Sequence, residues 1–246
     1  MESITIFWLT ILMFLTALLY SSVGQAGASG YLAVMAIFGI PPEVMKPTAL
    51  ALNILVASIA TIKFYRVGAF SWRILLPFAL GSIPFAFIGG SLALPGHLYK
   101  PIVGIILIYA AYRLLRANHL NDTDPINPLP FWAGVFSGVA IGFISGLTGV
   151  GGGIFISPLL LFMGWAHARE TAGISAAFIL LNSIAGLLGN LASVSQLPNV
   201  IIYWAPAVVI GGFIGAEYGS KQLGSLALKR LLAIVLFIAG LKMLFI

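Results

Sequence analysis

The chain has 246 residues, of which 61% are hydrophobic and 7% are charged, whereas a soluble domain has roughly 25% charged residues. This composition excludes a soluble globular fold, and the long apolar runs predict an all-α polytopic membrane protein in a lipid bilayer. The absence of cysteine excludes disulfides and thiolate metal sites. The net charge of +6 is not read as a sign of nucleic-acid binding, because lysine and arginine report orientation in a membrane protein.

The apolar pattern divides the chain into successive segments that are expected to be helices. They are 4–22, 28–40, 47–64, 72–94, 98–116, 130–147, 150–165, 171–192, 201–220 and 226–245. Segments 28–40 and 150–165 are too short to cross a hydrocarbon core of about 30 Å comfortably. They are either shallow spans or the second limbs of re-entrant hairpins.

The basic residues fall unevenly between the two sides if the chain crosses, or enters and returns, at every segment. One side receives Lys63, Arg66, Arg73, Arg113, Arg116, Arg169, Lys221, Lys229 and Arg230, and the other receives Lys46, Lys100 and Lys242. The positive-inside rule therefore predicts that the first group is cytoplasmic and that both termini lie outside, in a bacterial inner membrane.

A glycine-rich break interrupts the apolar pattern twice, at Gly24–Gly30 and at Gly149–Gly153. Irregular backbone in a membrane is tolerated only where it is buried in protein or lines a polar cavity. Two breaks in corresponding positions of two halves indicate the substrate site of a transporter.

A weak repeat extends beyond the breaks. It pairs Gly24–Gly27 with Gly149–Gly152, Phe38-Gly39 with Met163-Gly164, the set Gly81, Ala86 and Gly89 with Gly211, Ala216 and Gly219, and Leu98–Lys100 with Leu228–Arg230. Each half holds an odd number of segments, so 1–117 and 131–246 are expected to form an inverted-topology repeat with discontinuous helices at the breaks. Residues 118–130 would be a cytoplasmic linker. The alternative is that small residues recur only as close-packing faces.

The breaks suggest how the protein binds a ligand. The first N–H groups of a helix lack intrahelical acceptors and carry partial positive charge, so two converging helix starts would hold a small anion without a buried lysine or arginine. The candidate substrate-binding residues at the breaks are Ser22, Gly24, Gln25, Gly27, Ser29, Gly30, Thr148, Gly149, Gly151, Gly152 and Gly153. The alternative is that these glycines merely permit close helix crossing.

The segments after each break contribute further polar candidates, namely Thr48, Asn53, Ser175 and Asn182. Asparagine inside an apolar helix also ties helices together, which is the competing interpretation. The charges Glu43, Lys46, Arg169 and Glu170 are expected in loops on opposite faces. They are interpreted as solvated loop charges, with gating charges as the alternative. Glu217 lies within a turn of a predicted cytoplasmic helix end, and no buried carboxylate marks a proton-coupling group, so the coupling ion stays open.

An enzyme is the first competing class. Gly27–Gly30 matches the G-x-S-G pattern of rhomboid-type serine proteases, which also need a histidine within reach of the serine. His97, His119 and His167 lie at segment ends or in loops, and Ile154 occupies the repeat position of Ser29. We therefore expect neither an enzyme nor a metal site or cofactor.

The chain resembles the TauE/SafE sulfite-exporter family of membrane proteins, also called the 4-toluene sulfonate uptake permease family. The resemblance rests on residues 24–40, on Ser145–Pro158 and on the following Ala172–Ser175. The first motif departs from the usual glycine-rich form at Gln25, Ala26 and Ala28. The resemblance implies movement of sulfite or organosulfonates, commonly outward.

The expected function is therefore a secondary transporter of a small sulfur oxyanion. A passive anion channel on the same scaffold is the alternative, since a missing coupling carboxylate also suits passive flow. A non-transporting membrane assembly or sensor is a third class, for which a chain without soluble domains offers little support. Substrate, direction, coupling ion and assembly into a homo-oligomer stay open.

Overall fold

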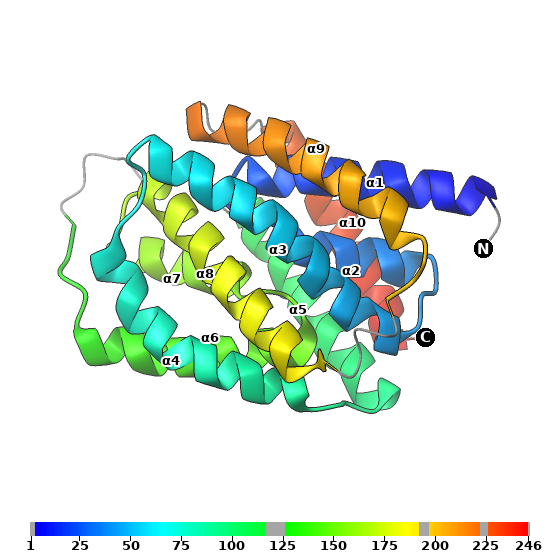
Figure 1. The fold of residues 1–246 in the computed structure, drawn as a ribbon, viewed down its shortest axis with the longest axis horizontal. Helices are drawn as coiled ribbons and strands as arrows, with labels where there is room; N and C mark the ends of the chain where they lie inside the picture. The colour runs from blue at the N-terminus through cyan, green and yellow to red at the C-terminus, as the bar shows by residue number, and fades with distance from the viewer. Residues whose placement is uncertain (1–2, 117–125, 192–196, 222–225, 246) are drawn as a thin grey trace.

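The computed structural model describes residues 3–116, 126–191, 197–221 and 226–245. These residues form helices and no strand (Figure 1). The helices are α1 (Ser3–Ser21), α2 (Ala28–Ile37), α3 (Pro42–Arg66), α4 (Trp72–Ser91), α5 (Gly96–Arg116), α6 (Phe131–Thr148), α7 (Gly153–Phe162), α8 (Ala168–Gly189), α9 (Ile201–Lys221) and α10 (Leu226–Phe245). Each expected segment is thus confirmed as a helix. Linker residues 118–125, with His119, lie outside the described residues.

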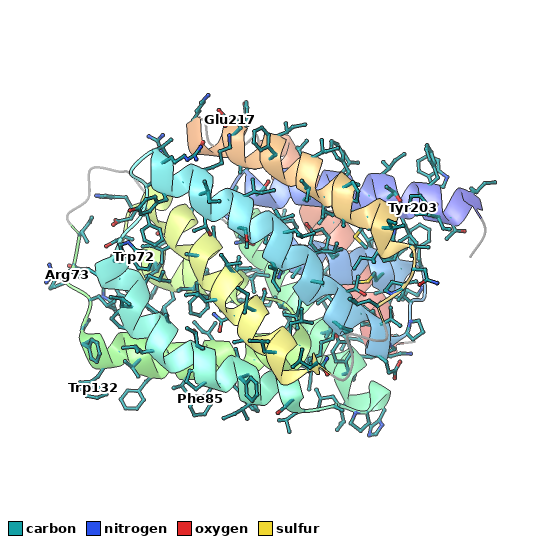
Figure 2. All side chains as sticks on the ribbon, viewed as in Figure 1. Trp72, Arg73, Phe85, Trp132, Tyr203 and Glu217 are labelled. Carbon is teal, nitrogen blue, oxygen red and sulfur yellow. The ribbon has the colours of Figure 1, made fainter. Side chains whose placement is uncertain are left out.

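Six of the described helices, α1, α3, α4, α6, α8 and α9, are long and apolar enough to cross a membrane. A polytopic α-helical membrane protein is therefore confirmed. Three exposed aromatic side chains mark the two ends of these helices. In Figure 2, Trp72 and Trp132 lie at the left end and Tyr203 lies at the right, as expected for residues at a membrane–water interface.

Both predicted breaks interrupt the helical path. Six residues separate α1 from α2, and four separate α6 from α7. The backbone turns through the left-handed region at Gly27, with φ of 105°, and at Gly152, with φ of 84°. A residue with a Cβ rarely adopts this conformation, so glycine lets the chain leave one helix and start another at once.

The short helices are the second limbs of re-entrant hairpins. Each of α2 and α7 has 10 residues, or about 15 Å, half of a bilayer core. In Figure 1, α1 and α3 begin at the same end of the molecule, so α2 returns toward it; α6 and α8 begin at the opposite end, so α7 returns there. The two hairpins thus enter from opposite ends, and shallow spans are excluded.

The two short helices also end alike. The N–H of Gly39 donates to Ala36 O at 3.1 Å and that of Ile40 to Met35 O at 3.0 Å. After α7, Gly164 donates to Leu161 O at 3.2 Å and Trp165 to Leu160 O at 2.9 Å. This pair of bonds is the Schellman motif, which needs a left-handed residue, here Gly39 and Gly164.

The helix boundaries correct one prediction. Helix α3 begins at Pro42 and not at residue 47, because proline is favoured in the first turn, where no N–H is needed. Helix α8 begins at Ala168 and not at residue 171. The four charges expected in loops, Glu43, Lys46, Arg169 and Glu170, therefore lie within the first five residues of these helices. Lys46 is buried, so its interpretation as a solvated loop charge is wrong.

Glycine sets the closest helix contacts. Helix α4 packs on α6, and α1 packs on α9. A Cβ on Gly81 of α4 would lie 2.1 Å from Val135 O of α6, and one on Gly211 of α9 would lie 2.4 Å from Phe14 O of α1. Such approaches of backbone to backbone require the missing side chain, as in other membrane helix pairs.

Candidate functional site

The two glycine breaks meet at one small cavity. The first half contributes the end of α1, the break and the start of α2, and the second half contributes the second break and the start of α7. Helices α3 and α8 close the sides. The lining residues are Tyr20, Gln25, Ala26, Gly27, Ala28, Ser29, Asn53, Val150, Gly153, Ile154 and Ile179. None of these lining residues carries a charged side chain.

The starts of α2 and α7 bring unpaired amides to this cavity. The first helical bond of α2 runs from Tyr31 N to Gly27 O at 2.8 Å, and that of α7 from Phe155 N to Gly152 O at 3.0 Å. The N–H groups before them, including those of lining residues Ala28, Ser29, Gly153 and Ile154, have no acceptor within the described residues. No side chain caps either helix. Buried helix starts without caps are sites that call for a ligand or water.

Glycine also allows α3 and α8 to close around the second break. A Cβ on Gly153 would lie 2.3 Å from Ile179 Cδ1, and one on Gly151 would lie 2.6 Å from Asn53 Nδ2. Larger residues would force these side chains away. The glycines therefore bring a polar and an apolar side chain against the unpaired amides.

Two hydroxyls form the polar wall of the first half. Ser29 Oγ donates to the Tyr20 hydroxyl at 2.8 Å, and both residues are buried. Because the serine is the donor, the phenolic proton of Tyr20 remains available to a ligand oxygen.

Asn53 forms the polar wall of α3. Its side chain is fully buried, and Nδ2 donates to Ser183 Oγ of α8 at 3.3 Å. Oδ1 has no hydrogen-bond partner within the described residues. A buried acceptor without a donor is costly, which makes this oxygen a group that a ligand can satisfy.

The cavity is small in this conformation. It offers about 10 Å³ to the centre of a water molecule, which is room for roughly one water. A three-oxygen anion is larger than that, so its entry requires the walls to separate.

The structure divides the predicted site residues into two groups. Gln25, Gly27, Ser29, Asn53 and Gly153 line the cavity. Ser22, Gly24, Gly30, Thr48, Thr148, Gly149, Gly151, Gly152, Ser175 and Asn182 do not, although several shape the breaks.

Several residues of the second group face other partners. Gly24 lies against Ala172 of α8, Gly30 against Thr16 of α1, and Gly149 against Lys46 of α3. The hydroxyl of Ser22 bonds to the preceding helix α1, that of Thr148 bonds to its own helix α6, and Ser175 bonds to Ser157 Oγ at 2.7 Å. Asn182 Nδ2 donates to Phe178 O at 2.7 Å within α8.

Sequence reasoning missed Tyr20 as a lining residue. A tyrosine in an apolar helix reads as a core residue, and only its position just before the break distinguishes it. Ile154 was noted only as the counterpart of Ser29, yet both line the cavity. Val150 and Ile179 carry no polar signal, so only the fold reveals them.

The proposed gating charges lie away from the cavity, at helix ends. Lys46 Nζ donates to the carbonyls of Gly90 at 2.8 Å, Leu92 at 3.1 Å and Gly89 at 3.3 Å, which caps the C-terminus of α4. Arg169 donates to Ser220 O near the C-terminus of α9. Both contacts place a cation at the negative end of a helix.

Glu43 is exposed, and Glu170 is partly buried. Glu217 of α9 pairs with Lys63 of α3 and with Lys221 of its own helix. In Figure 2 it lies at the upper left, at the end of α9. The carboxylate is therefore an ion-pair partner at a helix end.

Comparisons with known proteins agree with this architecture. The family model described as sulfite exporter TauE/SafE matches residues 9–243. The "Probable membrane transporter protein y4hK" of Sinorhizobium fredii is 45% identical over 96% of this chain and 97% of its own length.

More distant relatives have similar names. The "Probable membrane transporter protein MJ0441" of Methanocaldococcus jannaschii is 26% identical over 84% of this chain and 82% of its own length. The "Probable membrane transporter protein YjnA" of Bacillus subtilis is 24% identical over 89% of this chain and 92% of its own. No solved structure matches the chain. The match over nearly the whole length places this chain in the TauE/SafE family of membrane transporter proteins.

Proposed function

We propose that this chain is a secondary transporter that carries a small sulfur oxyanion, such as sulfite or an organosulfonate, outward across the bacterial inner membrane. The observation that carries the proposal is the convergence of two uncapped helix starts on one cavity without a charged side chain. The name of the matching family supports the sulfur oxyanion.

The physical basis is a fixed set of backbone donors. The starts of α2 and α7 direct N–H groups and the positive ends of two helix dipoles toward the same space. Discontinuous membrane helices bind anionic substrate groups in this way in other transporters. Tyr20 and Gln25 add side-chain donors to the amides. An anion bound there avoids the cost of burying a lysine or arginine in the membrane.

Alternating access would act through the two halves of the chain. The cavity has room for roughly one water, so the anion enters only when the hairpins α1–α2 and α6–α7 move apart on one side. Rocking of one half against the other would open the site to each side in turn.

The packing supports an inverted repeat as the basis of this motion. Helix α4 packs on α6 and α8, while its proposed counterpart α9 packs on α1 and α3. In the proposed repeat α6 corresponds to α1 and α8 corresponds to α3, so the contacts of α4 in one half match the contacts of α9 in the other. The paired glycines follow the same rule, since Gly89 lies against Phe143 of α6 and Gly219 against Ser22 directly after α1.

The test is the flux of radiolabelled sulfite in proteoliposomes that contain the purified protein. Saturable flux with counterflow is the expected result. Single-channel currents in a planar bilayer would instead favour the passive channel. Absence of flux for sulfite and for every organosulfonate would contradict the proposal.

A matched pair of variants tests the site. Gly153 and Gly96 are each the first residue of a helix. A Cβ at Gly153 would meet Ile179 at 2.3 Å and Gln25 at 3.7 Å, both in the cavity wall, whereas one at Gly96 would meet only Pro42 at 3.9 Å. Gly153→Ala should raise the KM for sulfite about tenfold, from overpacking that costs about 1–3 kcal/mol. Gly96→Ala should leave it unchanged.

A further inference from the structure

Two helix N-termini give the cavity a partial positive charge that adds up to about one elementary charge. Each helix N-terminus corresponds to about half an elementary charge, so the starts of α2 and α7 together provide about one. No lining residue adds a charged side chain, and Val150, Ile154 and Ile179 make part of the wall apolar. A dianion in this space would keep about one uncompensated charge away from water, which is strongly unfavourable. The cavity therefore suits a monoanion.

Asn53 offers the ligand a hydrogen-bond acceptor, which the backbone amides of the helix starts do not. Its fully buried Oδ1 accepts no hydrogen bond within the described residues, while Nδ2 is engaged by Ser183 of α8. The helix amides and the phenol of Tyr20 at the cavity have protons to donate, and the side-chain amide of Gln25 can both donate and accept. An anion with only bare oxygens satisfies these donors and leaves Oδ1 unpaired. An anion with one O–H group satisfies both kinds of group.

From these two observations we infer that the site selects a singly charged oxyanion that bears a proton, namely hydrogen sulfite over the sulfite dianion and over sulfonates. The inference rests on the proposed function and specifies the chemical form of its substrate. The amides at the starts of α2 and α7 bind the bare oxygens, and Asn53 Oδ1 accepts a hydrogen bond from the O–H group.

The first experiment measures flux in proteoliposomes at fixed total sulfite, with the same pH inside and outside, across the pH range in which hydrogen sulfite loses its proton. Once the dianion predominates, the rate should fall about tenfold for each further pH unit, because the monoanion falls by that factor. Methanesulfonate is the control, since it is a monoanion without an acidic proton. Its flux should stay constant, which excludes titration of the protein as the cause.

The second experiment compares two asparagines. Asn53 and Asn182 are both fully buried, and neither Oδ1 has a partner in the described part of the chain, but only Asn53 lines the cavity. Asn53→Leu should reduce the ratio of hydrogen sulfite flux to methanesulfonate flux about fivefold, the value of one lost hydrogen bond. Asn182→Leu should leave the ratio unchanged. Thermal unfolding in detergent establishes that both variants are folded.

Three results would overturn the inference while leaving sulfur-oxyanion transport intact. They are a sulfite rate that rises with the dianion, a methanesulfonate flux that varies with pH as the sulfite flux does, and an equal change of the ratio in Asn53→Leu and Asn182→Leu. Absence of flux for all of these anions at every pH would overturn the proposed function itself.

Discussion

Two buried tyrosines stand beside the first glycine break, and only one of them reaches the cavity. The hydroxyl of Tyr20 accepts a hydrogen bond from Ser29 and lines the cavity. The hydroxyl of Tyr31 donates to Ala26 O at 2.7 Å, and Tyr31 is not a lining residue. Each makes one hydrogen bond in a buried setting, so the pair separates the effect of a lost bond from the effect of a lost ligand contact.

Tyr20→Phe should weaken sulfite binding about fivefold, since one hydrogen bond contributes about 1 kcal/mol. Tyr31→Phe should lower the free energy of unfolding by about 1 kcal/mol, the value of its lost hydrogen bond, and should leave the affinity for sulfite unchanged. Sulfite binding is measured by calorimetry in detergent, and stability by thermal unfolding. An equal loss of affinity in both variants would show that Tyr20 acts only through packing.

At the residue scale, sequence reasoning found the part of the site that breaks the helical pattern. Gly27 and Gly153 stand out because no apolar helix needs glycine runs, and Asn53 stands out because it is polar. Tyr20 and Ile179 were not found, because they look like ordinary core residues in the sequence. Lys46 was misplaced in a loop, since the contact of its side chain with α4 depends on tertiary packing.

Lys46 matters at the scale of the element, because it caps a helix. Its ammonium group contacts three carbonyls at the C-terminus of α4, and the residue is buried. Arg169 has a similar contact at the end of α9. Each cation therefore fixes the end of a long helix that packs on the helices around the site.

Lys46→Met should lower the free energy of unfolding by about 1–2 kcal/mol, because charge-assisted hydrogen bonds to the end of α4 are lost. Lys221→Met removes an exposed ion-pair partner of Glu217 and should change stability little. Denaturation in mixed micelles measures both variants. Equal stability of Lys46→Met and the unmodified protein would contradict the cap.

Two glycines give a second prediction about elements. A Cβ on Gly146 of α6 would lie 2.0 Å from Ala86 O of α4, whereas one on Gly186 of α8 would have its nearest neighbour at 3.4 Å. Gly146→Ala should destabilise the protein by about 1–3 kcal/mol, because a helix backbone must move. Gly186→Ala should be neutral, or stabilising by up to about 1 kcal/mol, since alanine favours a helix. Thermal unfolding distinguishes the two.

At the element scale, helix existence was predictable and helix ends were not. Long apolar runs determined α1 and α6 within one residue. The start of α3 was missed by five residues, because the predicted segment began at Pro47, although Pro42 stands in the first turn of the helix. The sequence could not decide whether α2 and α7 are shallow spans or re-entrant limbs. The answer depends on the end of the molecule at which the following helix, α3 or α8, begins.

At the scale of the whole molecule, α4 offers a direct test of orientation. Ser71 directly precedes α4, and Ser91 is its last residue, so the two serines lie at opposite ends of one long apolar helix. The distribution of basic residues predicts that the end with Ser71 is cytoplasmic. The described start of α1 and end of α10 lie at the opposite end of the molecule (Figure 1).

The chain has no cysteine, so single cysteines can report this orientation without background labelling. In intact cells, a membrane-impermeant maleimide should label Ser91→Cys and should leave Ser71→Cys unlabelled until the membrane is permeabilised. The reversed pattern would place both termini in the cytoplasm and would contradict the positive-inside assignment. Retained sulfite flux in both variants is the control for folding.

The uncapped starts of α2 and α7 have a practical consequence for mutagenesis. The groups directed at the cavity belong to the peptide chain itself, so no substitution other than proline removes them. An alanine scan would therefore underrate this region, and family members could diverge widely in their wall residues while recognising the same chemical group. Replacing single amide linkages by esters, at Ser29 or Ile154, would delete one donor and leave every side chain in place.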